Sequence, residues 1–346
     1  MDLKFNIIFV PGTVRYMRLA VLSLLKHSSY TYRLIANGLD SRECALLVEF
    51  CRKSDRLEYF YYPSKRVLEH GMMLNLLFQR ESSPYFCMAD SDIFAMGPFE
   101  EELERHLQEC DVLSSCLTLD MDPSDVLSGF LGICLKTPGG LPLAPTFLSV
   151  YRTDLFRKII AETKIGFEAY RPTVYLPESV KDIDLPDNLE EPSLIDTGKL
   201  LNILASQYGA RFRHCEFPNF IHIGGISNLR VSKREKMKEI LRGFLKRPYA
   251  LTDEYLRSEM RRRSRGKSLR GQQGTSNRGQ ADARLRVRAL RNPLAMYFKC
   301  LFQSLFDGTP EPLFKLSDER LRQSVNRTSR LIRDIYNEEY GGQKAE

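Results

Sequence analysis

The sequence lacks any run of about 20 apolar residues, the length that an α-helix needs to cross a bilayer. Its first ten residues have no basic start, no long apolar run and no small-residue cleavage site, so no secretory signal is expected. The eight cysteines contain no Cys-x-x-Cys pair and follow no regular spacing. This pattern argues against a zinc ribbon or a disulfide scaffold, and it predicts a cytoplasmic protein with reduced thiols.

The charge is unevenly distributed along the 346 residues, although the composition is that of a globular protein, with 43% hydrophobic and 27% charged residues. Residues 230–300 carry 21 Lys and Arg against 6 Asp and Glu, a local balance of +15. Because the net charge is +7, the remainder carries −8. The sequence therefore predicts an acidic globular part joined to a basic arm, the name used here for residues 230–300.

Short apolar segments alternate with helical patterns through the first ninety residues. Strands are expected over residues 6–10, 32–36, 57–62 and 85–89, with an amphipathic helix after each of the first three. This alternation predicts an α/β fold whose mostly parallel sheet is flanked by helices. Ligands of such sheets bind at the carboxyl ends of the strands.

The later part of the chain has a weaker pattern. Strands are expected over 111–117, 147–151 and 217–223, helices over 154–161 and 194–208, and an irregular loop over 170–192. The predicted organisation is a catalytic domain over 1–250, a basic disordered linker over 251–282 and a helical C-terminal tail over 283–346.

The clearest chemical motif is Asp90-Ser91-Asp92, which follows an apolar strand directly. Two carboxylates at a strand end can ligate a hard divalent cation that carries a diphosphate. The alternative is that they only open a turn and cap a helix. An aspartyl-phosphate hydrolase is disfavoured because Ile93-Phe94, not a small hydroxyl residue, follows the second Asp.

The order of these motifs resembles a GT-A fold nucleotide-sugar glycosyltransferase and, more narrowly, the bacterial family-2-like enzymes. The resemblance covers about residues 5–228 and is clearest around the acidic motif. It is carried by a first strand followed by Pro11-Gly12-Thr13, a second strand ending in Asn37-Gly38, the pair His70-Gly71 before a helix, and Asp90-Ser91-Asp92.

The resemblance implies a set of donor contacts. The nucleotide sugar would lie against Pro11, Thr13, Asn37, His70, Gly71 and Asp90, while Asp90 and Asp92 would hold Mn²⁺ or Mg²⁺ on the diphosphate. Asn37 stands where the family carries an acidic residue, so the identity of the base does not carry over. From its residue type alone, His70 fits an ordinary helix start equally well.

Two further residues have a functional and a structural interpretation. His222, before Gly224 and Gly225, is either a structural histidine at a strand end or the third metal ligand that the resemblance implies. Asp196 stands where family-2-like enzymes carry a catalytic carboxylate that takes a proton from the acceptor hydroxyl. Its alternative is a helix N-cap, and Ile195 replaces the Glu that commonly precedes it.

The function predicted from the sequence is a metal-dependent glycosyltransferase of the hexosyltransferase type. It would move a sugar from a nucleoside diphosphate to a glycan or lipid-linked hydroxyl, with inversion if Asp196 is the base. The alternatives are a sugar-nucleotide nucleotidyltransferase and a nucleic-acid-binding protein. The basic arm could attract an anionic membrane at its inner face, whereas stacking on nucleic acid is disfavoured because residues 257–291 contain no aromatic side chain.

Overall fold

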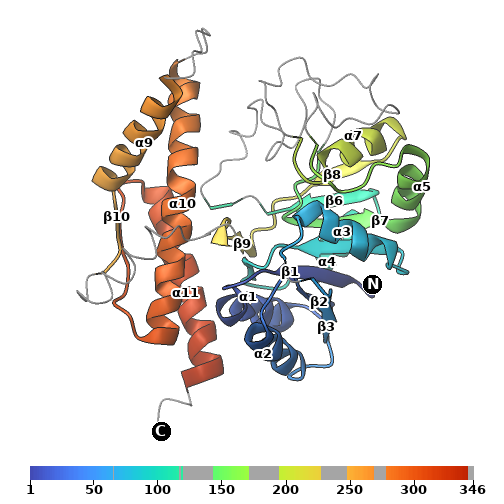
Figure 1. Ribbon diagram of the computed structural model, residues 1–346, viewed down its shortest axis with the longest axis horizontal. Helices are drawn as coiled ribbons and strands as arrows, with labels where there is room; N and C mark the ends of the chain where they lie inside the picture. The colour runs from blue at the N-terminus through green and yellow to red at the C-terminus, as the bar shows by residue number, and fades with distance from the viewer. Residues whose placement is uncertain are drawn as a thin grey trace. The chain divides into compact units, whose positions relative to one another are not determined.

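The computed structural model describes residues 1–64, 66–116, 118–119, 143–170, 195–226, 248–268 and 278–341, without the side chains of 263–268 and 278–288. The chain forms two compact units (Figure 1). The first comprises Met1–Leu117 and Asp122–Phe220, and the second comprises Thr118–Met121 and Ile221–Glu346. The irregular loop expected over 170–192 falls almost entirely outside the described residues.

The first unit is built on a seven-stranded sheet. Its strands are β1 (Lys4–Phe9), β2 (Thr31–Ala36), β3 (Leu57–Tyr61), β4 (Tyr85–Ala89), β6 (Val112–Ser115), β7 (Leu148–Arg152) and β8 (Phe212–His214). They lie in the order β3-β2-β1-β4-β7-β6-β8, and all neighbours are parallel except β7, which runs antiparallel to both β4 and β6. The expected α/β architecture, with a mostly parallel sheet, is confirmed.

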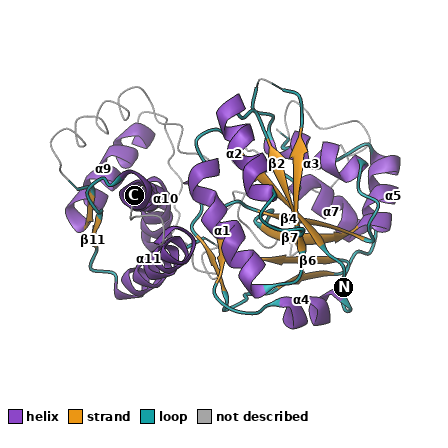
Figure 2. Ribbon diagram, turned by 90° about the horizontal axis from the view of Figure 1, so that it is seen from below, coloured by secondary structure: helices purple, strands orange, loops and turns teal. Residues whose placement is uncertain are grey.

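Helices cover both faces of this sheet (Figure 2). They are α1 (Val14–His27), α2 (Ser41–Cys51), α3 (His70–Gln79), α4 (Glu100–Leu107), α5 (Thr153–Thr163) and α7 (Lys199–Gln207). Strands covered on both faces need apolar side chains at nearly every position, and Ile7, Leu34 and Val150 are fully buried. The central strand β4 is a continuous apolar run for this reason.

Aromatic side chains fill the space between the sheet and helices α3, α5 and α7. Phe78 of α3 meets Phe86 of β4 edge to face, with ring centroids 5.2 Å apart. Phe167 contacts both of these rings and also Tyr151, at centroid distances between 5.4 and 5.7 Å. Burial of such rings stabilises this half of the core.

The second unit contains three helices and two short strands. They are α9 (Asp253–Ser268), α10 (Arg278–Asp307), α11 (Glu319–Tyr340), β10 (Ala250–Thr252) and β11 (Leu313–Lys315), and the two strands pair in parallel. α11 begins at the N-cap Asp318, whose carboxylate accepts a hydrogen bond from the Leu321 amide. Its buried stripe is Leu321, Val325, Thr328, Ser329, Ile332, Ile335 and Tyr336, so the expected amphipathic tail helix is confirmed.

The segment expected to be a disordered linker is largely helical. α9 covers 253–268, and α10 already begins at residue 278. α9 is anchored at its first residue, because the Asp253 carboxylate accepts a hydrogen bond of 3.0 Å from the Ser317 amide. The expectation of disorder was wrong there, whereas the three-part domain division remains a prediction. Among the described helices, none is long and apolar enough to cross a membrane.

Candidate metal and donor site

The acidic motif lies in a tight turn between β4 and the short strand β5 (Ile93–Ala95). The backbone N–H of Asp90 donates to the Phe147 carbonyl at 2.6 Å, which ties the turn to the start of β7. Asp90 is half-buried, whereas Asp92 is only 3% exposed. A carboxylate this deeply buried is costly unless a cation or hydrogen-bond donors compensate it.

His222 reaches the same place from a distant part of the sequence. It ends strand β9 (Phe220–His222), which pairs with β5. Its carbonyl accepts a 3.0 Å hydrogen bond from the Leu119 amide, and its side chain is 2% exposed. One ligand atom each of Asp90, Asp92 and His222 lies within 4.8 Å of the other two.

The donor set of this cluster fits a divalent cation. Two carboxylates and one imidazole supply oxygen and nitrogen ligands, and the carboxylates supply the charge that a hard cation prefers. The thiol of Cys116 is also buried, and burial raises its pKa well above the ordinary range, with a smaller contribution from Asp90.

Gly224 and Gly225 follow His222 in left-handed conformations, with φ of +76° and +80°. A Cβ on Gly224 would lie 2.3 Å from the Thr118 methyl group, so no larger residue fits there. These glycines turn the chain immediately after the histidine and keep its backbone close to residue 118.

The side chains expected to contact the nucleotide near α1 are held by the protein itself. The Thr13 hydroxyl donates to the Val10 carbonyl at 2.6 Å, and Thr13 is 4% exposed. The Asn37 amide donates to the Leu68 carbonyl at 3.0 Å and accepts from the Leu68 amide at 2.9 Å. Asn37 is 2% exposed, and its predicted donor contact stays a prediction. Pro11 remains exposed in this turn.

His70 and Gly71 form the first turn of α3, where His70 is half-buried and Gly71 is buried. A Cβ on Gly71 would lie 2.3 Å from the Phe167 carbonyl oxygen. The Asn75 side chain accepts a 2.7 Å hydrogen bond from the Phe167 amide one turn later. Gly71 is therefore required for close packing of α3, and its predicted donor contact stays a prediction.

Asp196 lies in the turn that precedes α7 and is half-buried. Its carboxylate accepts a 2.8 Å hydrogen bond from the Thr197 amide. The N-cap residue of α7 is Gly198, at φ +73°, and no side chain caps the helix there. Asp196 is thus not the N-cap, and the structural alternative considered for it from the sequence is wrong.

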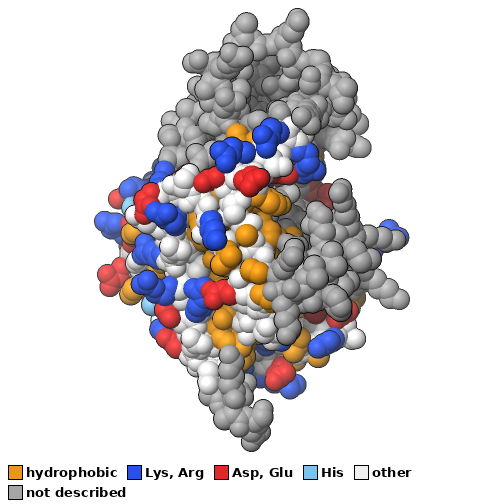
Figure 3. Space-filling model, turned by 90° about the vertical axis from the view of Figure 1, so that its left-hand side faces the viewer, with side chains coloured by type: hydrophobic (Ala, Val, Ile, Leu, Met, Phe, Trp, Pro, Cys, Tyr) orange, Lys and Arg blue, Asp and Glu red, His pale blue; other side chains and the backbone are white. Residues whose placement is uncertain are grey.

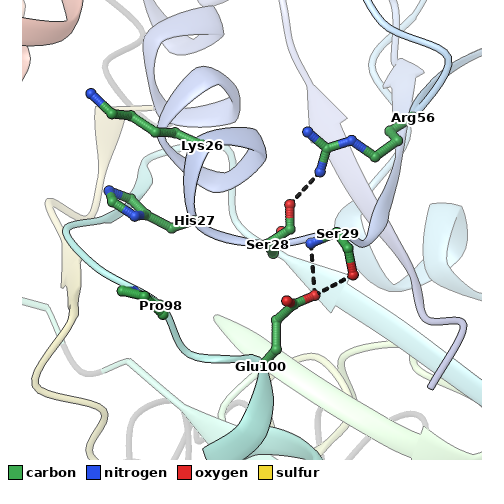
Figure 4. Close-up of a pocket in the computed structure, with 7 residues that line it drawn as sticks. All are labelled: Lys26, His27, Ser28, Ser29, Arg56, Pro98 and Glu100. Atoms are coloured by element: carbon green, nitrogen blue, oxygen red, sulfur yellow. Dashed lines mark hydrogen bonds between the residues drawn. The ribbon is translucent and has the colours of Figure 1, made fainter.

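A separate hollow of about 480 Å³ lies beside the residues that come just before β2 and β3 in the chain (Figure 4). This is the amino edge of the sheet, whereas the acidic turn follows the carboxyl end of β4. Its polar groups already serve the fold. Ser29 donates two 2.7 Å hydrogen bonds to Glu100, and Arg56 donates one of 2.9 Å to the Leu25 carbonyl at the end of α1. The hollow is lined by Lys26, His27, Ser28, Ser29, Arg56, Pro98 and Glu100.

No protein-family model and no curated protein matches the sequence. Among solved structures, the chain is similar to S. aureus TarS, with 16% identity, a TM-score of 0.41, and coverage of 71% of this chain and 43% of that one. It is also similar to the mannosyltransferase PcManGT from Pyrobaculum calidifontis in complex with GDP-Man and Mn²⁺, with 10% identity, a TM-score of 0.41, and coverage of 99% and 88%.

A third similar structure is a glucose-1-phosphate thymidylyltransferase from Bacillus anthracis in complex with sucrose, with 12% identity, a TM-score of 0.39, and coverage of 68% and 96%. All three TM-scores lie below 0.5, and the chain spans less than half of TarS.

Proposed function

We propose that this chain is a glycosyltransferase that moves a sugar from a nucleoside-diphosphate donor to an acceptor hydroxyl and requires a divalent cation. The observation that carries the proposal is the cluster of Asp90, Asp92 and His222 within 4.8 Å. It lies at the carboxyl end of β4, beside the antiparallel strand β7. Mostly parallel sheets bind nucleotides at the carboxyl ends of their strands.

The residues of the site have distinct tasks in this reaction. Asp90, Asp92 and His222 would hold the cation, and the imidazole in the set favours Mn²⁺ over Mg²⁺, which prefers oxygen ligands and water. A bound cation supplies neutralisation of the charge on the departing diphosphate. Asp196 accepts the proton of the acceptor hydroxyl while that oxygen bonds to the anomeric carbon and the bond from this carbon to the diphosphate breaks. Direct displacement of this kind inverts the sugar carbon.

Nucleotidyl transfer is disfavoured by the loop after β1. A triphosphate needs backbone N–H groups and cations there. Instead, the Glu43 carboxylate accepts a 2.8 Å hydrogen bond from the Gly12 amide, which places a negative group at this loop. Burial raises the pKa of the Glu43 carboxyl, and the hydrogen bond from the Gly12 amide opposes this rise.

The experiment that tests this function is a hydrolysis screen of nucleoside-diphosphate sugars, covering UDP, GDP, dTDP and CDP donors, with Mn²⁺ and with EDTA. Slow release of one nucleoside diphosphate that depends on the metal is the expected result. Release of pyrophosphate from a nucleoside triphosphate and a sugar 1-phosphate would instead identify the nucleotidyltransferase. Absence of both activities across the panel would contradict the proposed function.

We also propose that the acceptor is a glycan or lipid-linked hydroxyl at an anionic membrane surface on the cytoplasmic side, reached through the basic arm. The charge balance of +15 over 230–300 supports this, as does the exposure of Arg257 and Arg261 on α9. On the face seen in Figure 3, exposed apolar side chains lie among Lys, Arg, Asp and Glu side chains. Each basic residue near such a surface contributes about 1 kcal/mol.

Replacing six basic residues of the arm with Gln is expected to weaken binding to anionic vesicles and to leave hydrolysis of a soluble donor unchanged. The residues are Arg261, Arg262, Arg263, Arg265, Lys267 and Arg270. Co-sedimentation with phosphatidylserine vesicles at about 0.05 M and 0.15 M salt measures the effect, since salt screens exposed charges. The control removes six basic residues of the first unit, namely Arg52, Lys53, Arg80, Arg105, Lys158 and Lys164. Equal vesicle binding by both variants would contradict the proposal, and selective loss of nucleic-acid binding would identify the other partner.

A further inference from the structure

A lysine side chain lies in the interior of the first unit, in the first turn of α7. Lys199 is 1% exposed, and its ammonium group donates a 3.0 Å hydrogen bond to the Ala144 carbonyl. The Asn202 side chain, which is fully buried, donates to the same carbonyl at 3.0 Å. Burial of an ammonium group is costly, and an apolar side chain of similar length would avoid that cost. A role beyond packing is therefore expected of it.

The carbonyl that these two groups share belongs to a short segment, residues 143–147, that supports the acidic turn. Three residues after Ala144, the Phe147 carbonyl accepts the 2.6 Å hydrogen bond from the Asp90 amide. Between them, the Pro145 carbonyl accepts a hydrogen bond from the Ser149 hydroxyl. The segment is thus bonded to β7 in its middle and to the acidic turn at its end.

The backbone of Lys199 is hydrogen-bonded to the turn that carries Asp196. The Lys199 amide donates to the Asp196 carbonyl at 3.0 Å, and the Gly198 amide donates to the Phe167 carbonyl at 2.9 Å. Gly198 also approaches the 143–147 segment, because a Cβ on it would lie 3.2 Å from the Thr146 methyl group. Lys199 therefore connects the Asp196 turn to the 143–147 segment, which is bonded to the Asp90 amide.

We propose that Lys199 is a positioning residue, which sets the Asp196 turn relative to the Asp90 turn through the Ala144 carbonyl. The inference rests on the proposed function. A charge-assisted hydrogen bond is about twice as strong as a neutral one, and the second donor, Asn202, keeps the carbonyl oriented. Sugar transfer requires both the Asp90 turn and the Asp196 turn in place, whereas slow hydrolysis of the donor by water requires only the Asp90 turn. Lys199 therefore acts on transfer more than on hydrolysis.

The test compares the ratio of transfer to hydrolysis in Lys199→Met with that of the native protein. Met keeps an unbranched apolar side chain and removes the charged donor. We expect the transfer rate to fall about 10- to 100-fold, the range for misplaced catalytic groups, with the hydrolysis rate and donor KM within about threefold of native values. Loss of stability alone would lower both rates equally and leave their ratio unchanged. Lys199→Arg, which retains a positive donor, is expected to keep more transfer than Lys199→Met.

Leu201→Met is the matched control, because it changes a fully buried side chain on the same helix that has no group to donate to the Ala144 carbonyl. If Lys199→Met does not fold, Asn202→Ala removes the second donor to the same carbonyl and should shift the ratio in the same direction by a smaller factor. If the variant that folds has the same ratio of transfer to hydrolysis as the native protein, the inference is overturned. A native protein that hydrolyses no donor would instead refute the proposed function, so the two failures are distinguishable.

Discussion

Replacing Asp92 with Asn is expected to abolish metal-dependent transfer while leaving the fold intact. Asn has nearly the same volume, so the buried turn between β4 and β5 keeps its packing. The substitution removes one negative charge and one anionic ligand from the cluster of Asp90, Asp92 and His222. A loss of about 4 kcal/mol of transition-state stabilisation corresponds to a fall in kcat of about 10³-fold.

The measurement is the transfer or hydrolysis rate across a Mn²⁺ titration, together with a thermal unfolding curve. The apparent Mn²⁺ affinity should fall with kcat, and the native protein should be stabilised against unfolding by Mn²⁺ and nucleoside diphosphate together more than the variant is. Asp154→Asn serves as the control, because it neutralises a carboxylate that is exposed and paired with Arg152. Near-native turnover of Asp92→Asn at limiting Mn²⁺ would rule out the assignment of the cluster.

The parts of this site that the sequence predicted are those encoded locally. Asp90 follows the apolar strand β4 directly and Asp92 comes two residues later, so the strand pattern places both at the sheet edge. His222 is more than one hundred residues away, and only the family resemblance connected it with the acidic motif. The structure brings the three together through the pairing of β5 with β9.

Contacts with partners distant in sequence could not be predicted. The Asn37 amide pairs with the backbone of Leu68, 31 residues away, and nothing at position 37 signals that contact. Lys199 was missed for a related reason. A lysine in the first turn of a helix is ordinarily exposed, and only the packed structure shows that the Ala144 carbonyl receives it.

Asp40-Ser41-Arg42-Glu43 has the sequence pattern of a capping box, and the structure forms half of it. The Asp40 carboxylate accepts a 2.8 Å hydrogen bond from the Glu43 amide, as an N-cap does. The Glu43 side chain turns away to the Gly12 amide instead of returning to the cap. Similarly, 253–268 lacks the apolar periodicity of a core helix, yet it is helical because Leu256 is buried and Asp253 is bonded to Ser317. Tertiary contacts override the local pattern in both places.

Replacing Asp196 with Asn is expected to lower transfer by about 10²–10⁴-fold, the usual contribution of a general base. Donor binding should be retained, because Asp196 is assigned to the acceptor and not to the cation or the nucleotide. The turn should also be retained, since the Asn side-chain oxygen can still accept the hydrogen bond from the Thr197 amide. The measurement is single-turnover transfer with saturating donor, beside the dissociation constant of the donor-metal complex.

A control for lost structure is available on α2, where Asp40 is a genuine N-cap. Asp40→Ala should cost about 1 kcal/mol of unfolding free energy and leave transfer nearly native. Asp196→Asn should show the reverse pattern, with native stability and little transfer, because Gly198 and not Asp196 is the N-cap of α7. If Asp196→Asn instead behaved like Asp40→Ala, the carboxylate would be structural. The proton of the acceptor hydroxyl would then have to leave through another group, and direct displacement with inversion would lose its assigned base.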